Sequence, residues 1–219
     1  MLQGLDLDKL AAKKKFAFVD GLSGLFIPKQ NVRLNVGEKI LSNPDLGSVA
    51  AEIQKAVQTL EEGGKVLLVV DQLDLLLAAG GNHVGAVDVA DMILGVREVC
   101  KHSQKIILYH INYIDEFIQL VYATVITVSA DYPFVSAQKT PLELDHAAFL
   151  LSVAHQADFI MSLRLLDSGT ARDVSGVVRI TAGDQNVGSE EDIQARVEEK
   201  ELLYFVGGDG GVKVFERGQ

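Results

Sequence analysis

The sequence contains a single cysteine, Cys100, so no disulfide can form within the chain and metal motifs built on cysteine pairs are excluded. Basic residues are also scarce, with 20 lysines and arginines against 30 aspartates and glutamates, a formal net charge of −10. A protein that wraps nucleic acid by itself usually has the opposite sign. This balance predicts that any contact with nucleic acid comes from a local basic loop inside an assembly.

No apolar run has the length of a signal-peptide core or a membrane span. Met1–Lys15 lacks a continuous apolar stretch, and Phe117–Ala130 is short and interrupted by Gln119, Thr124 and Thr127. We therefore expect no membrane contact and residence in the cytoplasm, with the nucleus left open as a second location. The hydrophobic share of 48% then indicates strands covered on both faces, or surfaces that contact other subunits.

The phosphate-binding motif G-x-x-x-x-G-K-[ST] is absent from the sequence, and with it the nest of backbone N–H groups that cradles a triphosphate. The histidines at positions 83, 102, 110, 146 and 155 do not have the spacing of metal ligands. We therefore expect no metal site and no cofactor, and interpret these histidines as surface or core residues.

Hydrophobic periodicity predicts alternating helices and strands in the first half of the chain. The expected elements are a strand at Lys15–Val19, a helix at Asp45–Glu62, a strand at Lys65–Asp71, a helix at Val84–Cys100 and a strand at Lys105–Ile111. This alternation is typical of βαβ units, in which helices flank a mostly parallel sheet.

The second half of the chain changes in character. Phe117–Ser129 fits either a helix or a strand, residues 113–140 are interpreted as an inserted loop, and Leu142–Ala154 fits a helix with Pro141 in its first turn. Short strands are then expected at Phe159–Leu166, Val177–Thr181, Leu202–Val206 and Val212–Phe215. The predicted class is α/β, a single domain over residues 1–219 with a C-terminal antiparallel β extension.

The strand Val66–Asp71 ends in a carboxylate, as Walker B elements do, and as ordinary parallel strands often do where they meet a loop. In a Walker B element the aspartate holds Mg²⁺ beside the nucleotide phosphates. A catalytic ATPase often has a glutamate next, but here the next residue is Gln72. Asp71 is therefore interpreted as a degenerate Walker B-like position, and we expect no ATP hydrolysis by this chain alone.

One stretch, SGTARDVSGVVRI at Ser168–Ile180, resembles a turn in the sixth subunit of the Elongator complex. Other stretches are similar to the same family in the same order, namely Phe16–Leu22, the strand segment Val66–Gly80, and the C-terminal pair LLYFV and VKVFERG. The similarity extends over most of the chain, from Phe16 to Gly218.

The resemblance implies a RecA-like fold without functional Walker motifs, in a single domain that is shortened at its N-terminus. It implies a non-catalytic subunit that forms a six-membered ring with the fourth and fifth Elongator subunits and works with the remaining subunits. The ring binds tRNA and supports modification of wobble uridine at carbon 5, while another subunit performs the chemistry. Arg172 and Lys139, both expected in loops, are the candidate phosphate contacts, although a solvated Arg172 fits the turn equally well.

Two other interpretations stay open. The first is a RecA-type ATPase whose phosphate loop lies in sequence upstream of Met1, with Asp71 holding Mg²⁺. The second is a pseudo-ATPase scaffold that has no contact with RNA.

Overall fold

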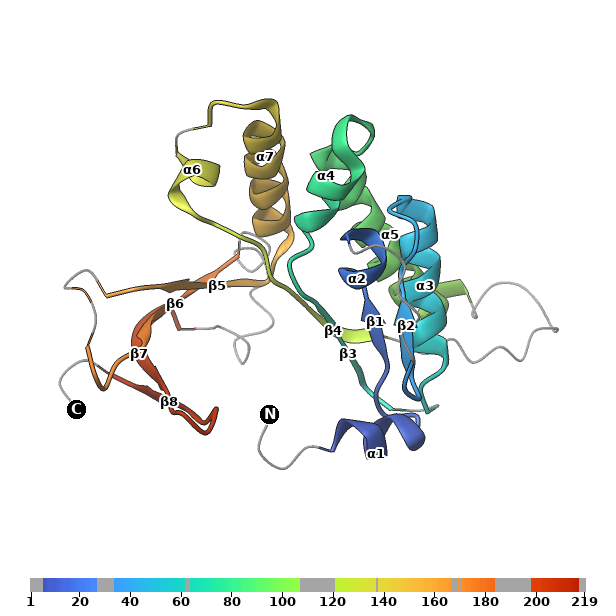
Figure 1. Cartoon of the computed structure of the whole chain (residues 1–219), viewed down its shortest axis with the longest axis horizontal. Coiled ribbons are helices and arrows are strands. Elements are labelled where there is room, and N and C mark those ends of the chain that lie inside the picture. The colour runs from blue at the N-terminus through green and yellow to red at the C-terminus, as the bar shows by residue number, and fades with distance from the viewer. Residues whose placement is uncertain are drawn as a thin grey trace. The chain divides into compact units, whose positions relative to one another are not determined.

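The computed structural model describes residues 6–26, 34–61, 64–106, 121–136, 138–166, 169, 171–183 and 198–216. The chain divides into two compact units. The N-terminal unit comprises Asp6–Leu150, and the C-terminal unit comprises Leu151–Gln219 together with Met1–Leu5. Figure 1 follows the helices and strands of both units along the chain.

Parallel strand pairs form the described sheets of the N-terminal unit. β1 (Phe18–Asp20) pairs with β2 (Glu38–Ile40), and β3 (Val66–Val70) pairs with β4 (Val121–Ile126). Parallel neighbours need a crossover connection, and the segment between β3 and β4 contains helices. β3 confirms the strand predicted from the apolar run at Lys65–Asp71, and β4 shows that the ambiguous stretch around it contains a strand.

Helix α3 (Leu46–Gln58) confirms the helix predicted between Asp45 and Glu62. It begins after Asp45, whose carboxylate accepts the backbone N–H of Ser48 at 2.9 Å. The same hydrogen bond, together with one from the Ser48 hydroxyl, holds the pKa of Asp45 below its usual value. The 3.6-residue repeat of α3 buries its apolar side chains Val49, Ile53 and Val57.

Helix α5 (Ala86–Ile106) contributes the other large share of this core and packs against α3. Its fully or almost fully buried side chains are Val89, Ile93 and Val96. Val87 on the same helix is 70% exposed. The helix starts at Ala86, and the position of Val87 on the helical wheel turns it away from the core.

The remaining described helices are α1 (Leu7–Ala12), α2 (Ser23–Phe26), α4 (Leu75–Gly80), the 3-10 helix η1 (Gly81–His83), α6 (Tyr132–Val135) and α7 (Pro141–Gln156). α7 confirms the helix predicted at Leu142–Ala154, and Phe149 on its inner face has no exposed surface. Among the described residues, no helix combines the length and the apolar character needed to cross a membrane.

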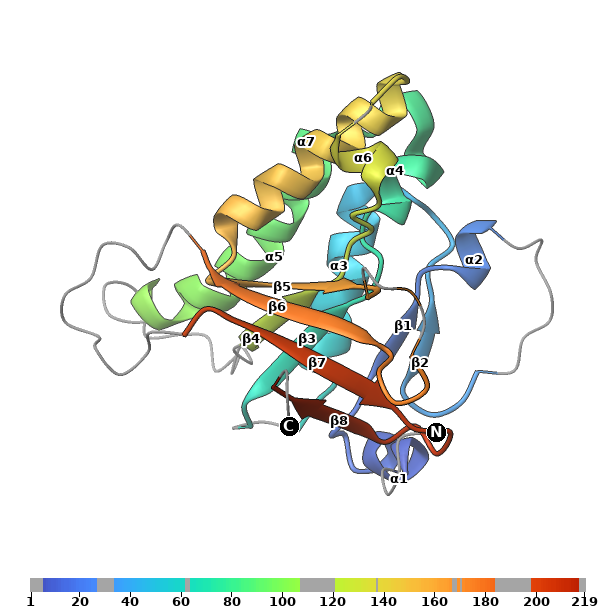
Figure 2. The same ribbon diagram turned by 90° about the vertical axis from the view of Figure 1, so that its left-hand side faces the viewer.

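The C-terminal unit contains a four-stranded antiparallel sheet in the order β5-β6-β7-β8 (Figure 2). The strands are β5 (Phe159–Arg164), β6 (Gly176–Ala182), β7 (Lys200–Val206) and β8 (Val212–Phe215). All four predicted strands are present, and β7 and β8 form a hairpin, with Val206 opposite Val212 at its closed end.

The described residues correct two further predictions. Lys105 and Ile106 end α5, so the strand predicted at Lys105–Ile111 does not begin there; its other residues lie outside the described ranges. Helix α5 continues through Lys105 and Ile106, the first two residues of the run that its apolar content indicated as a strand. In addition, β3 is not buried on both faces, because Leu67 and Val69 are 60% and 58% exposed. The α/β class and the antiparallel extension are confirmed, whereas the RecA-like arrangement remains a prediction.

Candidate functional site at the carboxyl ends of β3 and β4

Thr127 joins the carboxyl ends of the two parallel strands β3 and β4. Its hydroxyl donates a hydrogen bond to Asp71 Oδ1 and accepts the backbone N–H of Gln72 at 2.8 Å. Its main chain continues the pairing, because its N–H donates to the Val70 carbonyl at 3.0 Å and its carbonyl accepts the N–H of Leu73 at 3.3 Å. One side chain thus fixes the position of the Asp71 carboxylate at the edge of the sheet.

The turn after Asp71 has an unusual backbone. Gln72 has a φ of 51°, in the left-handed region that side chains other than glycine seldom adopt. Both Asp71 and Gln72 are exposed. The bonds to Thr127 hold this conformation in place, and strained residues of this kind often occur at functional sites.

The side chains available as metal ligands limit the chemistry at this edge of the sheet. Among the described residues, no three or more His, Cys, Asp or Glu side chains lie close enough to hold a metal ion together. Mg²⁺ usually keeps several waters and binds through one or two carboxylates plus substrate phosphates. Among the described residues, Asp71 would therefore bind Mg²⁺ together with waters and with ligands such as the phosphates of a nucleotide.

A buried polar pair lies three residues beyond Asp71, at the start of α4. Asp74 Oδ2 is 3.1 Å from His146 Nε2 on α7, and their side chains are 8% and 6% exposed. With Asp74 ionised, Nε2–H donates to the carboxylate. The Phe134 ring from α6 stacks on the imidazole, with 4.3 Å between the ring centroids. The pair therefore holds α7 to the segment that follows the Asp71 turn.

This pair is only partly satisfied. Within the described part of the chain, Asp74 Oδ1 and His146 Nδ1 are buried and have no hydrogen-bond partner. An unpaired buried polar atom costs about 1–3 kcal/mol. This cost offsets the attraction between Asp74 and His146, so the pair contributes little net stability but favours this one position of α7.

Lys139, a predicted RNA contact, lies just before α7 and is exposed. Its backbone N–H donates to Glu143 Oε2 at 2.6 Å, and that of Thr140 donates to the same oxygen at 2.8 Å. The Thr140 hydroxyl in turn accepts the N–H of Glu143 at 3.2 Å, which completes a capping box at the start of the helix. These bonds hold the pKa of Glu143 below its usual value, with the Lys139 bond the largest cause.

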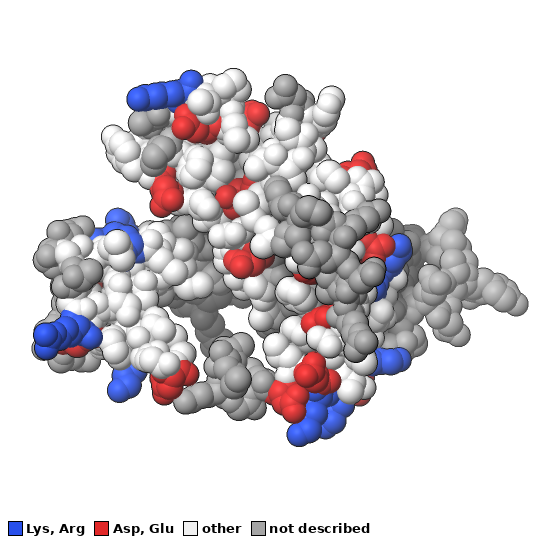
Figure 3. All heavy atoms as spheres, viewed as in Figure 1, with Lys and Arg blue, Asp and Glu red and all other residues white. Residues whose placement is uncertain are grey.

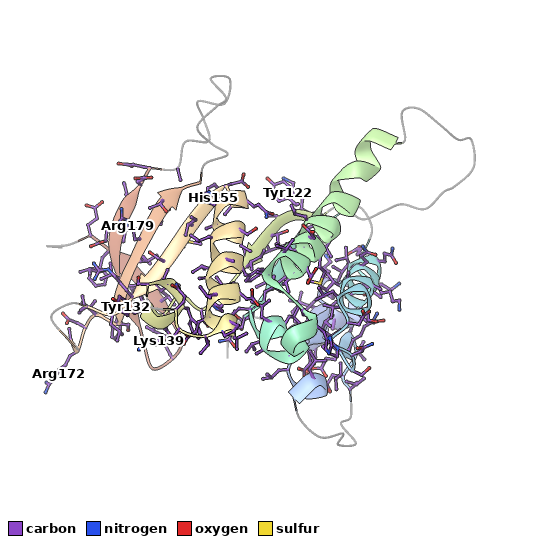
Figure 4. All side chains as sticks on the ribbon, turned by 90° about the horizontal axis from the view of Figure 1, so that it is seen from above. Tyr122, Tyr132, Lys139, His155, Arg172 and Arg179 are labelled. Atoms are coloured by element: carbon purple, nitrogen blue, oxygen red, sulfur yellow. The ribbon has the colours of Figure 1, made fainter. Side chains whose placement is uncertain are left out.

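Arg172, the other predicted RNA contact, lies in the connection between β5 and β6 of the C-terminal unit and is exposed. Figure 4 shows its side chain directed away from the strands. The structure places Lys139 in the N-terminal unit and Arg172 in the C-terminal unit. On the face seen in Figure 3, the described lysines and arginines of each unit are scattered.

Sequence reasoning missed Thr127 and the Asp74–His146 pair. A weak signal exists for the histidine, because His146 lies three residues before Phe149 and so shares the buried face of α7. For Thr127 there is no such signal, since its role depends on the register between β3 and β4.

The fold defines the chain as a mixed α/β protein with parallel strand pairs and a separate antiparallel sheet. No family model matches the chain, and no curated protein matches it. The resemblance to the Elongator family therefore stays a prediction.

Proposed function

We propose that this chain is a RecA-like, non-catalytic subunit of an Elongator-type complex, which forms a ring with the fourth and fifth subunits. In this proposal the ring binds tRNA and supports modification of wobble uridine at carbon 5, while the remaining subunits supply the chemistry. The observation that carries the proposal is the segment Ser168–Ile180, whose resemblance to the family is the most specific in the sequence. Its described residues include the turn with Arg172 and the part of β6 from Gly176 to Ile180.

The assignment as a non-catalytic subunit rests on the edge formed by Asp71 and Thr127. The residue after Asp71 is a glutamine, which cannot act as a general base toward an attacking water. The Thr127 hydroxyl donates a hydrogen bond to Asp71 Oδ1 and so uses one of the acceptor sites of this carboxylate. The sequence supplies no phosphate loop to complete a nucleotide site.

The RNA contacts proposed are Arg172 and Lys139, since both side chains are exposed and lie outside helices and strands. Contacts of this kind neutralise phosphates without reading bases. Binding of tRNA by the assembled ring should therefore weaken as salt rises, and each lost contact should lower the slope of that dependence by about one.

The assembly is tested by expressing the chain with two RecA-like partners and measuring the mass of the purified complex. A hexamer containing two copies of each subunit is expected, and failure of this chain to join the partners would overturn the proposal. The RNA contact is tested with Arg172→Gln in the same complex, with Arg179→Gln on β6 as the matched control. Loss of tRNA affinity should be several-fold for Arg172→Gln and absent for the control.

A second candidate function, nucleotide hydrolysis at a ring junction, is favoured by one observation. Asp71 is exposed at the carboxyl end of a parallel strand, where ligands of open α/β sheets usually bind. Asp71→Ala in the assembled ring should then lower ATP turnover at least tenfold. Unchanged turnover and unchanged nucleotide binding would remove any Mg²⁺ role for this residue.

A further inference from the structure

The sequence has one place where basic residues adjoin one another. Lys13, Lys14 and Lys15 follow helix α1, and no other two lysines or arginines are adjacent in the chain. All three residues are exposed, in the turn that leads from α1 toward β1. A chain with a net charge of −10 needs such a local concentration of positive charge to contact nucleic acid.

The backbone of this turn forms a Schellman motif with a lysine where glycine is usual. The N–H of Lys14 donates to the Ala11 carbonyl at 2.9 Å, and the N–H of Lys15 donates to the Leu10 carbonyl at 2.8 Å. Lys14 has a φ of 54°, in the left-handed region that a side chain with a Cβ atom disfavours. A glycine in place of Lys14 would make the turn more stable, so stability does not account for the lysine.

Capping of the helix end does not account for Lys14 either. Lysines near a helix C-terminus interact favourably with the last carbonyls and with the helix dipole. Here backbone N–H groups of the turn already bond to those carbonyls, and α1 is short, Leu7–Ala12. Lys13 and Lys15 would still supply positive charge at the helix end beside a glycine. A strained residue without a structural role points to a contact outside the chain.

The acidic neighbours of the turn leave two of its charges uncompensated. The ion pairs of this region are Lys9–Asp6 at 3.4 Å and Lys15–Glu61 at 3.6 Å. Within the described part of the chain, Lys13 and Lys14 form no ion pair. Asp8 lies in the first turn of α1, about 7.5 Å before Lys13 along the helix axis. Two exposed ammonium groups therefore remain available to an anionic partner.

The turn is also fixed in place. The carbonyl of Lys14 accepts the backbone N–H of Glu61 at 2.7 Å, and Glu61 lies just after α3. The ion pair between Lys15 and Glu61 joins the same two segments. A turn that is already ordered loses little conformational entropy when it binds a partner.

We propose that Lys13 and Lys14 contact phosphates of the tRNA backbone. The ammonium group of lysine is a compact point charge that neutralises a phosphate without reading a base. The inference rests on the proposed function, because its ligand is the tRNA bound by the assembled ring. It adds a pair of contacts to those of Lys139 and Arg172, and these two contacts come from consecutive residues of one ordered turn.

The decisive variant is Lys14→Gly, because stability and binding should change in opposite directions. The melting temperature of the chain should rise by about 2 °C, since glycine relieves the backbone at this position. The affinity of the assembled ring for an unmodified tRNA transcript, measured by fluorescence anisotropy, should fall about threefold. A loss of affinity in a more stable chain cannot come from unfolding.

A double variant measures both contacts against a matched control. Lys13→Gln combined with Lys14→Gly should lower tRNA affinity about tenfold. Between about 50 and 200 mM salt, it should also lower the slope of the salt dependence by about 1.5. Lys55→Gln is the control, because it removes one exposed lysine of the same unit that pairs with Glu52 at 2.7 Å. The control should leave affinity and slope unchanged.

The other outcomes separate this inference from the proposed function. A ring that binds tRNA with the same affinity and salt slope in the double variant would overturn the inference and leave the proposed function intact. Equal loss of affinity in Lys55→Gln would also overturn it, because net charge would then be the cause. Loss of ring assembly in the double variant would show that the lysines contact a partner subunit instead of RNA. A wild-type ring that binds no tRNA would refute both.

Discussion

The two units of this protein bury their apolar residues in different ways. In the N-terminal unit the core comes from helices, with Leu77, Val89 and Val96 fully or almost fully inaccessible. Among the described residues of the C-terminal unit, only Val177 is buried to that degree. The strands of this unit are nevertheless rich in apolar residues. The number of apolar residues in a strand is therefore a poor guide to their burial. Burial requires a second layer of helices or strands packed on the sheet.

The largest expected effect compares the same residue type in the two units. Phe149→Ala should lower the free energy of unfolding by about 4 kcal/mol, because Phe149 has no exposed surface and leaves a cavity. Phe159→Ala should cost about 1 kcal/mol or less, since Phe159 is 52% exposed. Urea denaturation at low protein concentration measures both. Equal losses would break the comparison and show that the sheet face is covered within one chain.

The next effect concerns the buried pair of the N-terminal unit. His146→Leu should cost on the order of 3 kcal/mol, because it leaves the Asp74 carboxylate buried without its partner. The double variant Asp74→Leu with His146→Leu should recover much of that loss, since an apolar pair leaves no orphaned atom. A double-mutant cycle by denaturation gives the coupling energy, and additive losses would mean that the two side chains do not interact.

A smaller effect compares hydroxyl groups that accept a backbone N–H in each unit. Thr127→Val should cost about 1–2 kcal/mol, because the hydroxyl serves both Gln72 and Asp71. Ser175→Ala, which removes the acceptor for the Val206 N–H in the C-terminal unit, should cost about 1 kcal/mol or less. Thr127→Ser keeps the hydroxyl and should remain near wild type in thermal melting, which separates the hydrogen bonds from the lost methyl group.

The smallest effect is a pH dependence at the start of α7. Because the pKa of Glu143 is lowered in the folded protein, the capping box stabilises α7 above the unfolded pKa of glutamate. That contribution is lost as pH falls through the lower, folded pKa. Melting temperatures of wild type and Glu143→Gln should therefore differ most at neutral pH and converge in acid. A difference that is constant from neutral to acidic pH would show that the carboxylate charge plays no part.

Much of the fold was open to prediction because it depends on local patterns. The repeat of Val49, Ile53 and Val57 defines α3 by itself, and the glycine-rich loop between two alternating segments defines the β7–β8 hairpin. The prediction of a strand at Lys105–Ile111 was wrong for Lys105 and Ile106, because a short apolar run fits the end of a helix as well as a strand.

The candidate site was only partly predictable, because only one of its two residues follows from a local pattern. Asp71 follows from the local pattern of an apolar strand that ends in a carboxylate. Its partner Thr127 lies 56 residues away, and the contact exists only because β3 and β4 pair in one particular register.

The sequence by itself thus determined many of the helices and strands, among them α3, β3 and the C-terminal strands, and that Asp71 follows a strand, because backbone propensities and capping act over a few residues. The tertiary structure decided that Asp74 and His146 form a buried pair, and that Phe159 and Met161 are exposed while Phe149 is buried. These outcomes depend on which surfaces meet after the chain folds, and neighbouring residues in sequence do not carry that information.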